Sequence, residues 1–99
     1  MSIYHITPTK KWREALESGL YSADSLEKDG FIHCCTKEQT ESILKTWFQG
    51  ESDLVLLEID PALLSAEVKD EDSHGTGELF PHIYGPLNLD AVIRVTVCA

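Results

Sequence analysis

The first residues of the chain follow a strand-like and then a helix-like spacing of apolar positions. Residues 3–6 are rich in β-forming side chains and predict a strand. Trp12, Ala15 and Leu16 then recur at helical spacing, and the helix that they indicate runs to about Ser18. The pattern therefore predicts a strand followed directly by a short helix, with Trp12 in the core.

A second strand and a second helix are predicted after a loop. Residues 20–30 are interpreted as that loop, and residues 31–34 as a short strand. Thr36 and Gln39 stand three positions apart, which is the spacing of the capping box that begins a helix. The helix then carries an apolar stripe made of Ile43, Leu44, Trp47 and Phe48, of which the two aromatic residues are expected in the core.

Strands dominate the second half of the chain. Residues 54–59 form the clearest buried strand, and Pro61 opens a turn from which Leu63 and Leu64 are expected to reach the core. Residues 73–77 contain two glycines and predict a loop. Further strands are predicted at residues 68–71, 79–84 and 91–97.

The order of these elements predicts the fold class. Two helices lie early in the chain and most strands lie late, which favours an α+β fold with a mixed, mostly antiparallel sheet of roughly five or six strands. The length of 99 residues is that of one domain, so residues 1–99 are expected to fold as a single unit.

The charge and the apolar segments exclude several classes of function. The chain has 8 basic and 17 acidic residues, a net charge of -9, which argues against nucleic acid and anionic membranes as partners. No apolar run approaches the roughly 20 residues that a membrane span needs. The first residues lack the pattern of a signal peptide, so the cytoplasm is the expected location. No feature identifies a protein partner.

The three cysteines support two alternative interpretations. Cys34, Cys35 and Cys98 are odd in number, which fits reduced thiols better than a disulfide framework. Cys34 or Cys35 is a candidate nucleophile, because the predicted helix that follows would lower the pKa of a thiol at its start. The alternative is that both cysteines are small packing residues of the core.

Three histidines each stand between apolar neighbours in a predicted strand. His5, His33 and His82 are the residues concerned, and on neighbouring strands they would line one pocket and transfer protons near neutral pH. If residues 80–84 are extended, His82 shares a face with Tyr84. The alternative for each histidine is a structural role with both ring nitrogens satisfied. His74 lies in a glycine-rich loop and is expected to be solvated.

Two further groups bear on the chemistry. Glu71 is a candidate carboxylate, although an acidic turn exposed to solvent explains it equally well. The three histidines with a cysteine would suit zinc, but none of the usual ligand spacings is present, and no metal site is predicted. Nucleotide-binding glycine motifs and the GxSxG motif are also absent from the sequence.

Several segments together resemble one protein family. They are IYHIT, GFIHCCTKEQT with the later WF, LVLLEID and FPHIYGPLNLDAV, and they cover nearly the whole chain. They are similar to the uncharacterised bacterial family called domain of unknown function 952. That family is thought to be related to the ADP-ribosyltransferase superfamily, which implies a split, mostly antiparallel β structure that binds NAD between its two halves.

The resemblance also implies roles for particular residues. His5 resembles the first-strand histidine that holds a ribose, and His33 lies in the second motif region with Cys35 and Thr36. His82 stands where the superfamily has a glutamate, and Glu71 is the nearest carboxylate. The implied catalytic residues are therefore His5, His33, His82 and Glu71, and the implied ligand-binding residues are Tyr84, Thr36 and Cys35.

Three functions follow as alternatives. The first is an enzyme that acts on NAD or a related nucleotide, and the second is a non-catalytic module of the same fold that binds a small ligand or a protein. The third is a metal-dependent enzyme that uses the histidines and a cysteine. The histidine in place of the superfamily glutamate favours the second alternative over the first.

Overall fold

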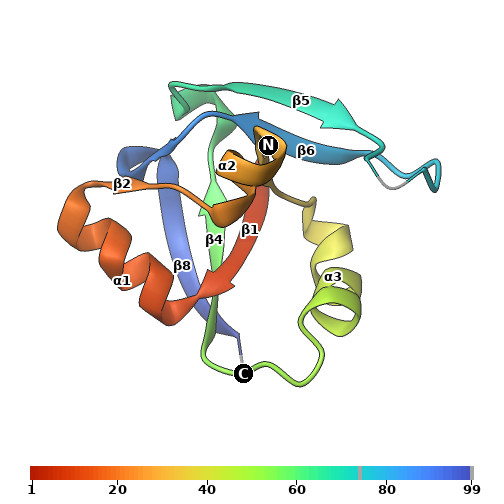
Figure 1. Ribbon diagram of the computed structural model, residues 1–99, viewed down its shortest axis with the longest axis horizontal. Helices are drawn as coiled ribbons and strands as arrows, with labels where there is room; N and C mark the ends of the chain where they lie inside the picture. Colours follow the sequence, from red (N-terminus) through yellow and green to blue (C-terminus); the bar gives the residue numbers. More distant parts are fainter. Residues whose placement is uncertain (74, 99) are drawn as a thin grey trace.

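The computed structural model describes residues 1–73 and 75–98, and these residues form an α+β fold with antiparallel sheets and few helices (Figure 1). The helices are α1 (Thr9–Ser18), α2 (Asp24–Asp29) and α3 (Thr40–Trp47), with 3₁₀ turns η1 (Lys37–Gln39), η2 (Pro61–Leu63) and η3 (Leu89–Ala91). The strands are β1 (Ile3–Pro8), β2 (Leu20–Tyr21), β3 (Ile32–His33), β4 (Leu54–Ile59), β5 (Glu67–Glu71), β6 (Phe80–Tyr84), β7 (Leu87–Asn88) and β8 (Val92–Cys98). None of the helices described is long and apolar enough to cross a membrane.

The first sheet has the order β1-β4-β8 and is antiparallel throughout. Its central strand β4 carries the apolar run LVLLEI, of which Leu57 and Ile59 are completely buried. Ile3 of β1 stands opposite Ile59 and belongs to the same core cluster as Trp12 of α1. Because side chains alternate along a strand, Tyr4 and Ile6 point to the other face of this sheet, toward α3.

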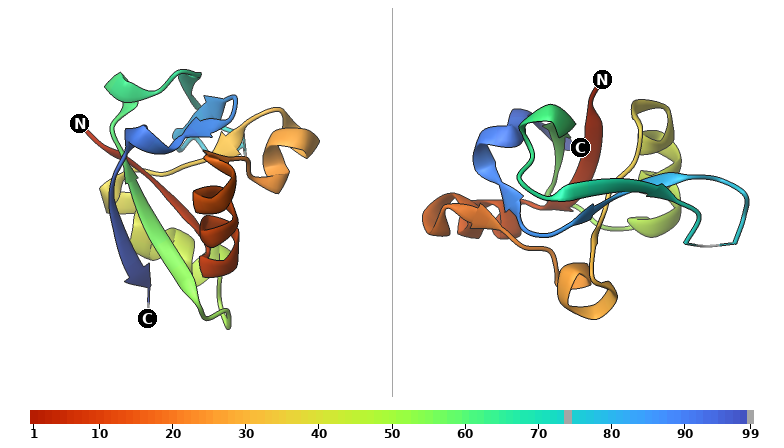
Figure 2. Two further views of the ribbon diagram at one scale, coloured as in Figure 1. Left: turned by 90° about the vertical axis from the view of Figure 1, so that its left-hand side faces the viewer. Right: turned by 90° about the horizontal axis from the view of Figure 1, so that it is seen from above.

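The second sheet has the order β3-β6-β5, and its two faces differ in the side chains that they carry. Ile32 and Ile83 are paired across β3 and β6, and both are fully buried in the core. His33 and His82 are the next pair, so both point to the opposite face. Figure 2 shows this sheet crossing one end of the β1-β4-β8 sheet.

A short segment joins the two three-stranded sheets. The backbone N–H of Cys34 donates to the Pro81 carbonyl of β6 at 3.0 Å. One residue later the chain pairs with β1 instead, because Cys35 and Tyr4 exchange two backbone hydrogen bonds of 2.8 Å. We call residues 32–35 the sheet junction. A third, two-stranded sheet pairs β2 with β7.

The helix start that the Thr36–Gln39 capping box predicts is confirmed. The Thr36 backbone N–H donates to Gln39 Oε1 at 2.9 Å, as the motif predicts. The helix begins there as the 3₁₀ turn η1 and continues as α3. Gln39 Nε2 also donates to the Leu79 carbonyl at 2.9 Å, which ties this start to β6.

The prediction of a loop over residues 20–30 is wrong. The segment contains β2 and α2, and α2 ends at Gly30, whose φ of 85° is the left-handed conformation that a glycine adopts without strain. No residue of α2 is buried, so the helix has no apolar stripe that periodicity could detect. Its signals are Asp24 in its first turn and Gly30 beyond its end.

Two residues predicted in the core lie largely outside it. Leu63 is 51% exposed, whereas its neighbour Leu64 packs against the core. The two residues differ because only one side of the turn η2 faces inward. Trp47 is 56% exposed, and α3 contains no buried residue at all. Trp12 is 8% exposed, as predicted. His74 lies outside the described residues.

Candidate functional site

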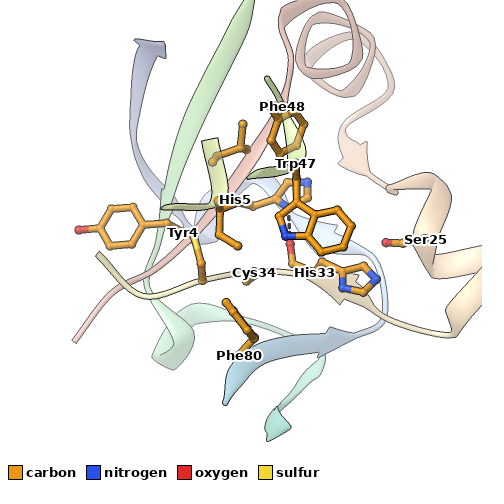
Figure 3. A pocket seen from close by; sticks show the side chains of 11 residues that line it. Tyr4, His5, Ser25, His33, Cys34, Trp47, Phe48 and Phe80 are labelled. Atoms are coloured by element: carbon orange, nitrogen blue, oxygen red, sulfur yellow. Dashed lines mark hydrogen bonds between the residues drawn. The ribbon is translucent and has the colours of Figure 1, made fainter. Parts of the chain in front are cut away.

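A cavity of about 340 Å³ lies where the two sheets diverge. We call it the junction cavity, and its size is within the range of small-ligand pockets. Figure 3 shows its lining side chains, which come from β1, α2, the sheet junction, α3 and β6. The lining residues are Tyr4, His5, Ile6, Ser25, His33, Cys34, Cys35, Ile43, Trp47, Phe48 and Phe80.

The apolar stripe of α3 forms one wall of this cavity. Ile43, Trp47 and the following Phe48 line it, which explains why a helix with such a stripe is left without buried residues. Exposed apolar surface lowers the stability and the solubility of a small protein, and a concave apolar patch of this kind is typical of ligand-binding sites. Phe80 supplies a further aromatic wall from β6.

His5 is held by hydrogen bonds at both ring nitrogens. Nδ1 lies 2.6 Å from the His33 carbonyl oxygen, which only accepts, so Nδ1 carries the proton. Nε2 lies 2.7 Å from the Tyr21 hydroxyl, which therefore donates to it. The Tyr21 and Thr7 hydroxyl oxygens are 2.8 Å apart, and Thr7 completes the chain as donor to Tyr21.

This arrangement gives His5 a positioning role. Burial lowers the pKa of His5 to about 4, so the ring is neutral at physiological pH. Both nitrogens are occupied, so His5 offers the cavity no free hydrogen-bonding atom. It instead fixes the backbone of His33, whose side chain reaches the cavity.

His33 is the histidine that a ligand would meet. Its side chain is 40% exposed, and Nε2 lies 3.0 Å from Asp29 Oδ2 at the end of α2. Figure 3 shows the Ser25 hydroxyl pointing toward the part of the cavity where the side chains of Trp47 and His33 lie. The Ser25 hydroxyl and the His33 imidazole therefore line the cavity, and the Asp29 carboxylate contacts His33 without lining the cavity itself.

His82 belongs to a separate cluster next to the cavity. Its Nδ1 lies 2.9 Å from Glu71 Oε1, and the Tyr84 hydroxyl donates a short hydrogen bond to the same oxygen. The ring of Phe31 stacks on the imidazole with centroids 4.0 Å apart. His82 is fully buried and its Nε2 has no protein partner. None of His82, Glu71 and Tyr84 lines the junction cavity.

The charge states of this cluster follow from its hydrogen bonds. The hydrogen bonds from Tyr84 and His82 lower the pKa of Glu71, which keeps the carboxylate ionised. The same carboxylate raises the pKa of the Tyr84 hydroxyl, and Lys69 Nζ lies 4.9 Å from the centre of the Tyr84 ring. The ionised carboxylate only accepts, so His82 carries a proton on Nδ1 and donates the hydrogen bond to Glu71.

The prediction of an activated thiol is wrong. Burial raises the pKa of Cys35 to about 12 and that of Cys34 well above its ordinary value. The expected helix dipole is weak here, because the helix begins as a single 3₁₀ turn while apolar surroundings disfavour the thiolate. Cys34 and Cys35 therefore line the cavity as small apolar groups, and Thr36 begins η1 outside it.

The residues described contain no group of three or more His, Cys, Asp and Glu side chains that could hold a metal ion. The pairing of His5 with Tyr21 and of His82 with Glu71 explains this, because each histidine uses a ring nitrogen within the protein. The metal-dependent alternative has no geometric support in this part of the chain.

Sequence reasoning did not identify Ser25, Asp29, Trp47 and Phe80 as site residues. Ser25 and Asp29 lie on α2, which was interpreted as a loop, and Trp47 was assigned to the core. The signal for α3 was its apolar stripe, and a stripe alone does not distinguish a core face from the wall of a cavity.

Comparisons with known proteins agree on one relationship. The family model described as protein of unknown function (DUF952) matches residues 6–95. The crystal structure of protein CC0527 from Caulobacter crescentus is 35% identical, with a TM-score of 0.87 over 97% of this chain and 84% of that chain. Its solution NMR structure gives 35% identity and a TM-score of 0.83, over 96% and 82%. No match is found among proteins with curated functions.

Proposed function

Because the chain belongs to the DUF952 family, whose function its description leaves open, we propose a function from the site alone. We propose that the junction cavity binds a flat heterocycle attached to a sugar, as in NAD-related compounds. The observation that supports this most directly is the apolar stripe of α3, which forms a wall of the cavity and leaves Trp47 56% exposed. Aromatic walls bind flat rings through dispersion and offset stacking.

The polar end of the cavity supports the sugar part of the proposal. The Ser25 hydroxyl and the His33 imidazole both line the cavity, and groups of these two kinds form the hydrogen bonds that sugar hydroxyls need. Few, localised polar groups in an apolar cavity are typical of sites that orient a small ligand.

The position of the cavity supports the proposed kinship with ADP-ribosyltransferases. That superfamily is expected to bind its ligand where its β structure splits, and the junction cavity lies where the β1-β4-β8 and β3-β6-β5 sheets diverge. The proposed kinship concerns the fold and the location of the site, and the chemistry has to be argued from the residues.

The residues favour binding over ADP-ribosyl transfer. Transfer needs a carboxylate near the anomeric carbon, and Glu71 does not line the cavity. His82 occupies the place of the superfamily glutamate in sequence, and it also lies outside the cavity. No carboxylate occurs among the residues that line the cavity, and Asp29, which contacts the lining residue His33, already forms a hydrogen bond with it. We place this binding function in the bacterial cytoplasm, because all three cysteines are free thiols.

An NMR titration of the isotopically labelled protein tests the proposal. We expect nicotinamide riboside and adenosine to shift the signals of Ser25, His33, Ile43 and the Trp47 indole, and to leave Trp12 unchanged. Trp47→Ala should weaken binding by about tenfold or more, because it removes an aromatic wall. The matched control is Leu16→Ala, since Leu16 is also 56% exposed but lies on α1. No shift with millimolar ligand would overturn the proposal.

A further inference from the structure

We infer that the junction cavity selects nucleosides without phosphate groups, and in particular nucleosides whose heterocycle is positively charged. The inference rests on the proposed function, because it names the class of ligand for the same site. It departs from what kinship with ADP-ribosyltransferases implies, which is NAD with its pyrophosphate. The residues present fit a nucleoside part of NAD and do not fit its pyrophosphate.

The lining of the cavity contains no cation. Neither lysine nor arginine occurs among its eleven residues, and the histidine at its mouth is hydrogen-bonded to a carboxylate. Phosphate sites in proteins are built from arginine, lysine or a row of backbone N–H groups at a helix start. The helix α2, whose Ser25 lines the cavity, carries Asp24 and Glu27 in its first turn, and these carboxylates disfavour a phosphate there.

The lysines that form ion pairs contact carboxylates and do not line the cavity. Lys11 pairs with Asp24 at 3.2 Å and Lys45 with Glu41 at 3.2 Å. Lys69 lies against the Tyr84 ring in the separate His82 cluster. With a net charge of -9, the field of the whole protein also opposes the approach of an anion.

The walls favour a positively charged ring. Trp47, Phe48 and Phe80 present aromatic faces or edges to the cavity, and a ring cation near an aromatic face is attracted by its quadrupole. Asp29 adds a full negative charge next to His33 at the mouth. A phosphate in the same place would lose its hydration without gaining a charged partner, which is costly.

Two matched pairs of compounds, measured by isothermal titration calorimetry on the full chain, test the inference. Nicotinamide riboside and nicotinamide mononucleotide differ by one phosphate, and so do adenosine and adenosine monophosphate. We expect each nucleoside to bind about tenfold or more tightly than its phosphorylated partner, since the site lacks a cation. Among the nucleosides, nicotinamide riboside should bind more tightly than adenosine.

A variant that introduces a positive charge provides the second test of the inference. Ser25→Lys places an ammonium group at the mouth of the cavity and should reverse the order within each pair. Ser73→Lys is the control, because Ser73 is exposed and does not line the cavity, so the order should stay as in the unmodified chain.

The outcomes separate the two proposals. If no compound of either pair binds, the proposed function itself is overturned. If all four bind and the phosphorylated members bind equally well or better, the proposed function stands and the inference is overturned. If the nucleosides bind more tightly and Ser25→Lys reverses the order, the inference is supported.

Discussion

His33 and His82 stand directly opposite each other on β3 and β6, with ring centroids 5.4 Å apart, yet only His33 lines the junction cavity. The difference arises from what each imidazole contacts. His33 turns toward Asp29 at the end of α2 and remains 40% exposed. His82 turns toward Glu71 and is covered by Phe31. Two histidines at one register position thus belong to different sites.

Replacement of the two tryptophans should separate binding from stability. Trp12→Ala removes a residue that is 8% exposed and should cost about 3–5 kcal/mol of unfolding free energy. Trp47→Ala removes a residue that is 56% exposed and should cost less than about 1.5 kcal/mol while it abolishes most ligand affinity. Urea unfolding monitored by circular dichroism measures both costs. Equal losses would show that Trp47 is a core residue after all.

Acidification should destabilise the protein through His5. Its pKa is about 4 in the folded chain and about 6.5 when unfolded, so the unfolded state binds the extra proton first. The stability linked to this difference is present above pH 6.5 and is lost as the pH falls toward 4, on the order of 3 kcal/mol. Urea unfolding of the wild type and of His5→Gln between these pH values measures it.

Comparison of the wild type with His5→Gln also removes the contribution of the carboxylates. They titrate in both proteins, so the difference between the two pH profiles isolates the histidine. A pH profile of His5→Gln that runs parallel to the wild type would contradict the lowered pKa of His5.

Thiol modification should proceed in a fixed order. Burial raises the pKa of Cys34 and Cys35 strongly, whereas Cys98 is only partly buried at the end of β8. Iodoacetamide at mildly alkaline pH should therefore label Cys98 first and leave the other two unmodified in the folded protein. Peptide mass spectrometry measures the order, and all three should react in denaturant. Rapid labelling of Cys35 would restore the nucleophile interpretation.

Removal of the Glu71 charge should lower the pKa of Tyr84. The carboxylate accepts the hydrogen bond of the Tyr84 hydroxyl and raises its pKa, so Glu71→Gln should bring the pKa back toward its ordinary value. NMR titration of ¹³C-labelled tyrosine follows Tyr84 directly. Glu78→Gln is the control, because Glu78 contacts Gln39 instead. An unchanged Tyr84 pKa in Glu71→Gln would show that the pair is not coupled.

The longer strands and two of the helices could be predicted because their signals are local, whereas the two-residue strands β2 and β7 were not predicted. The β4 run LVLLEI and the Thr36–Gln39 capping box each determine an element without help from the rest of the chain. The short helix α2 escaped prediction because it buries no side chain, and its end depends on the single residue Gly30.

The candidate site was predictable only in part, because it depends on tertiary packing. His5, His33 and His82 were expected in one pocket; His5 and His33 line the same cavity, whereas His82 does not line it. Their different roles could not be predicted, because Tyr21 and Asp29 determine them through side-chain contacts between separate elements. Trp47 was misassigned for the same reason, since the helical stripe fits a core face and a cavity wall equally well.

The exchange of two hydrogen bonds between Tyr4 and Cys35 has a mechanical consequence. These are the backbone bonds that continue the β1-β4-β8 sheet into the sheet junction, and both residues also line the cavity. A twist of one sheet against the other would concentrate at this pair and deform the cavity at the same time. We therefore expect the shape of the cavity and the relative orientation of the two sheets to change together. Hydrogen exchange of the Cys35 amide would report on both.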